Sequence, residues 1–125
     1  MSFQADIDIS VQTQFLEQES EPQSKRYVFA YTIEITNHSI EAIQLLNRYW
    51  KITDANNQVQ EVAGEGVVGK QPEIQPGQSF SYSSGAVLET SAGMMEGHYE
   101  FINNDQQRFQ AAIPAFALID PRQLH

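Results

Sequence analysis

The chain of 125 residues has the size of one ordinary domain, which we place at residues 1–125, and its seven basic and 16 acidic residues give a formal net charge of −9. Because nucleic acid and anionic lipid are themselves negatively charged, this balance argues against both as partners. The sequence contains no cysteine, which excludes disulfides, thiolate metal ligands and a cysteine nucleophile.

The first ten residues, MSFQADIDIS, resemble neither a signal peptide nor a membrane anchor. They lack the basic start and the apolar run of a signal peptide. No segment of the sequence approaches the roughly 18 consecutive apolar residues of a membrane helix. We therefore expect a soluble, cytoplasmic protein that does not bind a membrane.

Short β-strands separated by turn residues are predicted along the whole chain. In residues 7–15 every second residue is mostly apolar, and in residues 26–36 aromatic and β-branched residues share one face, as in half-buried strands. Residues 42–52 are apolar on both faces, which fits a strand that is covered on both sides or that uses one face for contacts. The remaining predicted strands cover residues 58–62, 79–90, 98–103 and 108–118, with turns at 54–57, 76–77, 91–93 and 103–105 and a bulge or sheet edge at Pro114.

No segment keeps the 3.6-residue period of an amphipathic helix. Seven or eight short strands at regular spacing, punctuated by turn residues, are instead typical of an all-β protein. The predicted fold is an antiparallel β-sandwich of the immunoglobulin or fibronectin type III kind.

The segment GEGVVGK, residues 64–70 and called the glycine loop below, contains two phosphate-binding motifs. Gly64, Gly66 and Gly69 form the pattern G-x-G-x-x-G, and the segment up to Lys70 matches a Walker A loop except for its last residue. Both motifs need a helix directly after the glycines, because the N-terminus of that helix faces the phosphate. The residues that follow therefore decide whether the motifs are meaningful.

Those residues disfavour a nucleotide site. Pro72 and Pro76 leave no room for a helix, and Gln71 stands where a Walker A loop has the hydroxyl that binds magnesium. Glu89 has the spacing of the ribose-binding acid of a dinucleotide site, but it lies in a predicted antiparallel strand. We expect the three glycines to allow positive φ between strands, with the two valines among them packed on the core. A backbone nest that binds an anion such as pyrophosphate beside the lysine remains the open alternative.

No catalytic or metal-binding constellation is recognisable in the sequence. His38, His98 and His125 are far apart and lack metal-ligand spacing. No serine lies in a nucleophile elbow, and the carboxylates fall on solvent-facing strand positions or in loops. We therefore predict a protein that is not an enzyme and that uses no cofactor or metal.

Arg48, Tyr49 and Trp50 belong to the residue types most enriched at binding hot spots. They predict an interaction face on the strand of residues 42–52, and an exposed strand edge would also let a partner add a strand. The alternative is that Trp50 is the buried tryptophan that many such sandwiches contain.

Three parts of the sequence carry a family resemblance. They are RYVFAYTIEITN at 26–37, residues 42–85 with their EV, GEGVVG, QP and PG pattern, and GMMEGHYEF with IPAFAL near the C-terminus. Together they resemble the bacterial ApaG family, also called CorD. The sequence departs from the family pattern at Asn57, where a turn glycine is usual, and at Tyr49, a position often taken by histidine.

The resemblance implies a fibronectin type III-like sandwich and a family without an established biochemical activity, so it supplies no catalytic residue. Bacterial members are associated with cobalt resistance and magnesium efflux. Related domains in eukaryotic F-box proteins and in a polymerase-delta-interacting protein point to protein binding. Gly64, Gly66 and Gly69 match the family's own glycine motif, which is the origin of its proposed link to pyrophosphate.

We therefore expect a non-catalytic module that binds a protein partner through a face or edge near Arg48 and Trp50. The alternative is a sensor or enzyme that engages a nucleotide or pyrophosphate at Gly64–Lys70. Direct binding of cobalt or magnesium is a third hypothesis.

Overall fold

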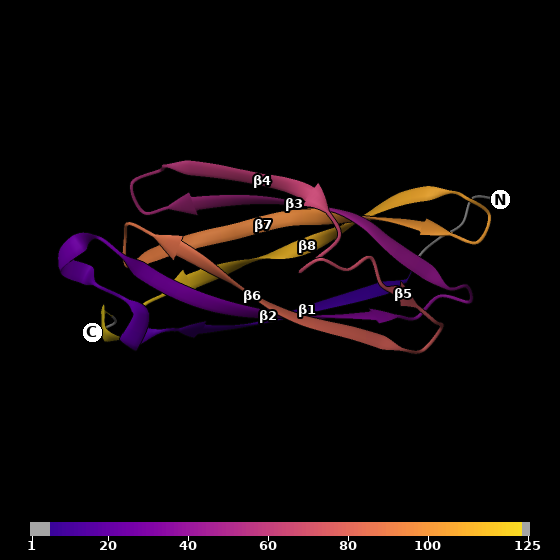
Figure 1. Ribbon diagram of the computed structural model, residues 1–125, viewed down its shortest axis with the longest axis horizontal. Coiled ribbons are helices and arrows are strands. Elements are labelled where there is room, and N and C mark those ends of the chain that lie inside the picture. Colours follow the sequence, from indigo (N-terminus) through magenta and orange to yellow (C-terminus); the bar gives the residue numbers. More distant parts are fainter. Residues whose placement is uncertain (1–5, 124–125) are drawn as a thin grey trace.

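The computed structural model describes residues 6–123, which form two antiparallel sheets packed against each other (Figure 1). The prediction of an all-β antiparallel sandwich is confirmed. The helical segments in this range are short 3-10 turns, and none of them could span a membrane. The strands are β1 (Ile7–Phe15), β2 (Tyr27–Asn37), β3 (Ile43–Asp54), β4 (Val59–Glu65), β5 (Glu73–Ile74), β6 (Ser79–Leu88), β7 (Ala92–Asn103) and β8 (Arg108–Ile119).

The two sheets differ in size and in their edges. The smaller one has the order β1-β2-β6, and the larger one has the order β4-β3-β7-β8. β5 pairs with Ile43 and Gln44 at the start of β3. It lies on the same side of β3 as β4, which pairs with residues 47–53 further along that strand. The glycine loop and the residues up to Pro72 therefore lie between two strands on the same side of β3.

The core between the sheets is rich in aromatic rings. Trp50 of β3 meets Tyr31 of β2 with ring centroids 5.5 Å apart and Phe116 of β8 at 5.8 Å. The hydroxyls of Tyr82 and Tyr99 are hydrogen-bonded to each other across the core. β2 contributes to this core as the alternation of residues 26–36 predicts, because the side chains that point inward from β2 are its aromatic and β-branched ones.

Two strand boundaries differ from the prediction by three residues or more, the short strand β5 was not predicted, and one local feature is confirmed. β4 continues beyond residue 62, and β7 starts at Ala92, where a turn was predicted, because Ala92 pairs with β8 and residues 93–95 pair with both β3 and β8. Hydrogen bonds to two neighbours override the turn preference of small residues. Pro114 lies, as predicted, at a bulge on an edge strand: Met95 pairs with Phe116 but Gly97 pairs with Ile113.

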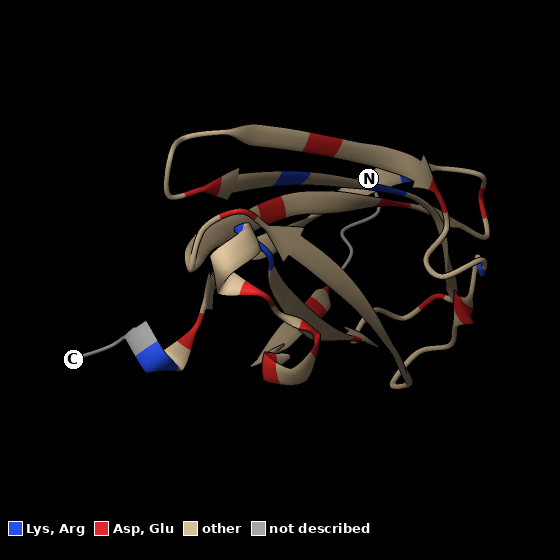
Figure 2. Ribbon diagram, turned by 60° about the vertical axis from the view of Figure 1, so that its left-hand side comes forward, with Lys and Arg blue, Asp and Glu red and all other residues tan. Residues whose placement is uncertain are grey.

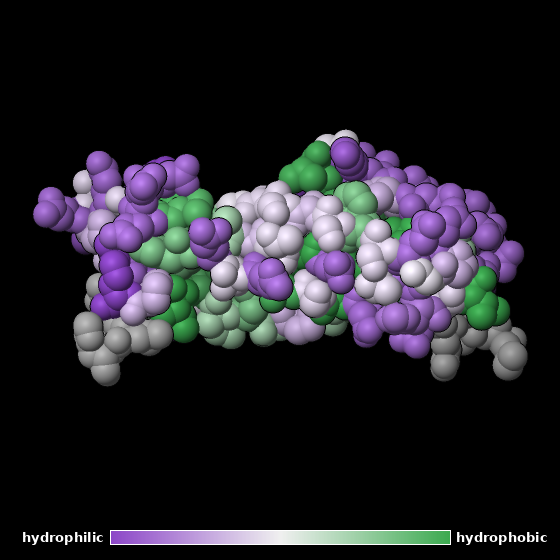
Figure 3. All heavy atoms as spheres, turned by 90° about the horizontal axis from the view of Figure 1, so that it is seen from below, coloured by the Kyte–Doolittle hydropathy of each residue, from purple (hydrophilic) through white to green (hydrophobic). Residues whose placement is uncertain are grey.

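The surface is acidic and has no broad apolar area on the side seen in Figure 3. Asp and Glu are spread over both sheets and their connections, with few Lys or Arg among them (Figure 2). In Figure 3, hydrophobic residues form separate patches, with weakly polar residues between them and hydrophilic ones gathered towards the two ends. Scattered apolar residues of this kind are normal for a protein surface.

Candidate functional site

The glycine loop leaves the β4 edge and folds back in a two-residue turn. The N–H of Val67 donates to the carbonyl oxygen of Lys70 (2.8 Å), and the N–H of Lys70 donates to that of Val67 (2.9 Å). Val68 (φ 42°) and Gly69 (φ 78°) form the tip in type I′ geometry. Gly66 has φ 65°, and a Cβ there would overlap the carbonyl oxygen of Lys70. Gly66 and Gly69 therefore meet the backbone requirement predicted from the sequence.

Gly64 is glycine for a different reason. It lies within β4, opposite Arg48 of β3, and its φ is not positive, so that expectation was wrong. A Cβ on Gly64 would lie 3.1 Å from a terminal guanidinium nitrogen of Arg48. The same nitrogen donates to the carbonyl oxygens of Glu65 (3.0 Å) and Gly66 (2.9 Å). The missing side chain of Gly64 makes room for this arginine.

The two valines of the loop have opposite environments. Val67 is fully buried in the core, as predicted, whereas Val68 is 55% exposed at the tip of the turn, so the prediction that it packs on the core is wrong. The type I′ turn imposes positive φ on Val68, which is unusual for a β-branched residue.

Most amides of the loop are used inside the protein, which weakens the phosphate hypothesis. The N–H of Gly66 donates to the carbonyl oxygen of Leu46 (2.8 Å), and those of Val67 and Lys70 serve the turn. The residues after the loop form β5 and a turn instead of a helix, in keeping with the argument from Pro72. The run of free amides that a phosphate-binding loop offers is not present between residues 64 and 70.

Arg48, Tyr49 and Trp50 do not share a face, because successive side chains of a strand point to opposite sides. Trp50 is only 2% exposed and lies in the core, which removes it from the predicted interaction face. Arg48 lies on the same side of β3 and is held by the glycine loop. Of the three, Tyr49 alone points to the outer side of the larger sheet.

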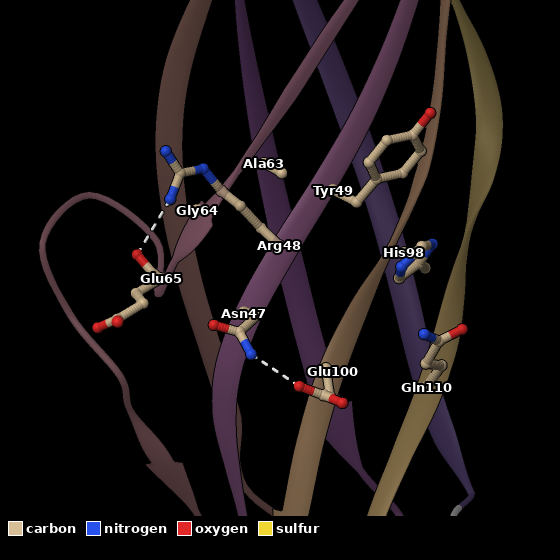
Figure 4. Close-up of a pocket in the computed structure, with 9 residues that line it drawn as sticks. All are labelled: Asn47, Arg48, Tyr49, Ala63, Gly64, Glu65, His98, Glu100 and Gln110. Carbon is tan, nitrogen blue, oxygen red and sulfur yellow. Dashed lines mark hydrogen bonds between the residues drawn. The ribbon is translucent and has the colours of Figure 1, made fainter.

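A shallow groove of about 520 Å³, called the Tyr49 groove below, lies on that outer side (Figure 4). The rings of Tyr49 on β3 and His98 on β7 stack with centroids 5.1 Å apart. Beside them, the Asn47 amide donates to the Glu100 carboxylate (2.7 Å), which also accepts from Arg108 (3.3 Å). The groove is completed by Arg48, Ala63, Gly64, Glu65 and Gln110.

Carboxylates border the Tyr49 groove and affect its central phenol. Partial burial raises the pKa of Tyr49, and the nearby carboxylates of Glu61 and Glu96 raise it further. The ammonium nitrogen of Lys51 lies 3.9 Å from a carboxylate oxygen of Glu96 and offsets part of the negative charge of Glu96. Tyr49 therefore remains a neutral hydrogen-bonding group at ordinary pH, inside a negatively charged rim.

The sequence reasoning missed the partners of Tyr49 in the groove. His98 and Glu100 belong to a segment in which Tyr99 and Phe101 are fully buried. Strict alternation in that segment places His98 and Glu100 on the outer side, so the pattern contained the necessary signal. That they meet Tyr49 depends on the register between β3 and β7, which the pattern does not contain.

Tyr82 and Tyr99 form a second polar feature that the sequence did not indicate. Burial raises the pKa of Tyr82 to about 12, and burial raises the pKa of Tyr99 further still. Each hydroxyl has the other as its hydrogen-bond partner. The pair satisfies two polar groups inside an aromatic core and is a structural feature.

The two histidines within the described residues, His38 and His98, are not brought together. His38 is hydrogen-bonded to the carboxylate of Asp8 at the surface (2.9 Å), His98 lies in the Tyr49 groove, and His125 is outside the described residues. Within residues 6–123 no three His, Asp or Glu side chains are grouped as metal ligands would be.

Comparison with known proteins finds relatives that cover nearly the whole chain. Residues 17–103 match the ApaG domain. Protein ApaG of Thiobacillus denitrificans is 53% identical over 119 residues, which are 95% of this chain and 94% of that protein. Protein ApaG of Sodalis glossinidius is 52% identical over 115 residues, 92% of each chain.

Two solved structures share the fold as well as the sequence. A crystal structure described as an ApaA protein of Bordetella pertussis has a TM-score of 0.92 and 41% identity, over 95% of this chain and 97% of that one. A structural genomics X-ray structure has a TM-score of 0.90 and 43% identity, over 95% and 90%. These relationships confirm the resemblance drawn from the sequence: the chain belongs to the ApaG family.

Proposed function

We propose that this protein is a non-catalytic binding module that recognises a protein partner through the Tyr49 groove. The observation that carries the proposal is the half-buried stack of Tyr49 on His98, flanked by amide and carboxylate groups. A partly exposed aromatic anchor surrounded by polar groups is typical of protein interfaces. Binding would remove the remaining ring surface from water while the polar groups around it find partners.

The polar groups of the groove favour recognition over catalysis. The Glu100 carboxylate is already engaged by Asn47 and Arg108, and Lys51 lies beside Glu96. A general acid or base needs a proton-transfer group that is free to reach its substrate. In the described part of the chain, the large tyrosine pKa shifts belong to the buried Tyr82 and Tyr99, away from the groove.

The family resemblance supplies the setting in which we place this module. We propose that it acts in the cytoplasm, in the cobalt resistance and magnesium efflux with which bacterial ApaG (CorD) proteins are associated. A protein contact suits that role better than a bound cation here, because the Glu100 carboxylate is already engaged by Asn47 and Arg108, and within residues 6–123 no three His, Asp or Glu side chains are grouped as metal ligands would be.

Affinity measurements on groove variants test the proposal. Partners captured on the immobilised protein are purified, and their Kd is measured for wild type, Tyr49→Ala and His98→Ala. The matched control is Val87→Ala, an exposed apolar residue (44%) on the outer side of β6. Loss of a central aromatic anchor should weaken binding about tenfold or more, and the control should bind like wild type. Unchanged affinity of both groove variants for every purified partner would overturn the proposal.

A further inference from the structure

β4 is an unprotected edge of the larger sheet. It pairs with β3 in an uninterrupted register, and within residues 6–123 no strand pairs with its other side. All of β4 is exposed except the half-buried Gly64. Edge strands are usually blunted by proline, by charged side chains such as lysine, or by a bulge; β4 has no proline, lysine or bulge, and its charged residues are Glu61 and Glu65, whereas β8 at the opposite edge has both Pro114 and a bulge. The unprotected edge can therefore accept an added strand.

The hydrogen bonds at the two ends of β4 identify which of its backbone groups are free. Just before β4, the N–H of Asp54 donates to the carbonyl oxygen of Gln58 (3.0 Å), and just after it the N–H of Gly66 donates to that of Leu46 (2.8 Å). In an antiparallel pair, bonded positions recur at every second residue. The residues whose N–H and C=O point away from β3 are therefore Val59, Glu61, Ala63 and Glu65.

Arg48 closes one end of this free edge. Its guanidinium reaches past Gly64 and occupies the carbonyl oxygen of Glu65 (3.0 Å). The N–H and C=O groups left for an incoming strand are those of Val59, Glu61 and Ala63.

The side chains along this edge specify the charge of the occupant. Glu61 and Glu65 project to the outer side of the sheet with Ala63 between them, and within the described residues neither forms an ion pair. Side chains directly opposite each other on paired strands stabilise when their charges differ and destabilise when they match. A second copy of this chain, with its net charge of −9, would bring glutamates against glutamates. A basic segment is the complementary occupant.

We propose that β4 binds an extended lysine- or arginine-bearing segment of a partner protein as an added strand. Two basic residues four positions apart lie opposite Glu61 and Glu65, with a small or polar residue opposite Ala63. This inference rests on the proposed protein-binding function and deepens it. Because Ala63 pairs directly with Tyr49 across β4 and β3, the added strand runs along the border of the Tyr49 groove.

Peptide titration tests the proposal directly. Isotope-labelled protein is titrated with acetyl-Ser-Lys-Val-Thr-Val-Lys-Ser-amide and with the same peptide carrying glutamate in place of both lysines. The lysine peptide should cause saturable amide shifts at Val59, Glu61 and Ala63 and should slow their hydrogen exchange. The glutamate peptide should bind at least about fivefold more weakly, because two exposed ion pairs are lost. Added salt should reduce this difference.

Variants separate the edge from general electrostatics. Glu61→Lys combined with Glu65→Lys should reverse the preference between the two peptides. Glu34→Lys combined with Glu89→Lys makes the same change in net charge at exposed positions elsewhere and should not reverse it. Ala63→Pro removes a free-edge N–H without removing a bond to β3 and should abolish the shifts. If the proline variant does not fold, the charge-reversal pair decides the question.

Equal affinity for the two peptides, or shifts confined to the unpaired edge of β6, would overturn the proposal. Failure of the peptides alone, while Tyr49→Ala still loses purified partners, would refute the added strand and leave the proposed function standing. Failure of both experiments would refute both.

Discussion

Replacing Gly64 with alanine tests why this position is glycine. Its φ is not positive, and the structure gives a reason of space: the Arg48 guanidinium lies against the missing side chain. If that reason is correct, the effect of an alanine at Gly64 must depend on the arginine. The experiment therefore introduces Gly64→Ala into the wild-type chain and into an Arg48→Met chain.

The structure gives the expected magnitudes. Glycine in a strand is about 0.5–1 kcal/mol less favourable than alanine, so Gly64→Ala alone would stabilise by that amount. Its Cβ would, however, press on three guanidinium atoms at 3.1–3.3 Å and disturb hydrogen bonds of 3.0 and 2.9 Å to Glu65 and Gly66. Loss of one bond to a charged group removes about 1.5 kcal/mol. The variant should therefore lose up to about 1 kcal/mol in the wild-type chain and gain about 0.5–1 kcal/mol in the Arg48→Met chain.

Urea unfolding followed by fluorescence measures both values. Trp50 is the sole tryptophan and is 2% exposed, so its emission reports loss of the core. A coupling of about 1.5 kcal/mol exceeds the scatter expected for independent sites, roughly 0.3–0.5 kcal/mol. An equal effect of Gly64→Ala in both chains would refute the spatial explanation and would point to the backbone or to a ligand.

Further predictions concern the rest of the loop and the buried tyrosines. Gly66→Ala should lower the free energy of unfolding by more than about 2 kcal/mol, since positive φ combines with overlap on the Lys70 carbonyl, whereas Gly69→Ala, with open space around it, should lower it by about 1 kcal/mol. ATP or diadenosine tetraphosphate, with or without magnesium, should leave the amide shifts of Gly66 and Gly69 unchanged, and saturable shifts there would establish the nucleotide hypothesis instead. Millimolar cobalt or magnesium should not raise the melting temperature, because within residues 6–123 no three His, Asp or Glu side chains are grouped as metal ligands would be. A metal that binds only the folded chain would raise that temperature, so a rise would establish direct metal binding. The contribution of Tyr82 to stability should not change with pH below about 10 and should fall between pH 10 and 12, where the unfolded tyrosine loses its proton and the folded one, with a pKa of about 12, keeps it; Tyr82→Phe should flatten that fall.

Features set by local chemistry were predictable from the sequence. The Pro76-Gly77 turn forms as expected, with Gly77 at φ 79° and the N–H of Gln78 donating to Gln75 (3.0 Å). Proline has no N–H to donate to a neighbouring strand, so Pro114 alone was enough to predict a bulge or a sheet edge at its position. The alternation of apolar and polar residues likewise predicted which side chains of β2 point into the core. None of these inferences needs to know which strand is the neighbour.

Features that depend on the neighbouring strand were not predictable. Val67 and Val68 are chemically identical, yet one fills the core and the other is exposed, because Val67 begins the turn and Val68 lies at its tip. Gly64 and Gly66 look equivalent in the motif, but only the register with β3 shows that an arginine lies against the first. The motif matched a phosphate loop because glycine serves turns, close packing and phosphate binding alike.

The alternation of β3 decides which of its residues can meet a partner, and that alternation changes along the strand. Leu45 is buried before the register shift against β7, and Trp50 is buried after it, although their positions differ by an odd number. One extra residue therefore exchanges the inner and outer sides, as a β-bulge does. Because residues 42–52 are apolar on both sides, their pattern does not show where the shift falls. A binding face on this sheet must accordingly be assembled across strands, from Tyr49, His98 and Ala63, and not from neighbours along the chain.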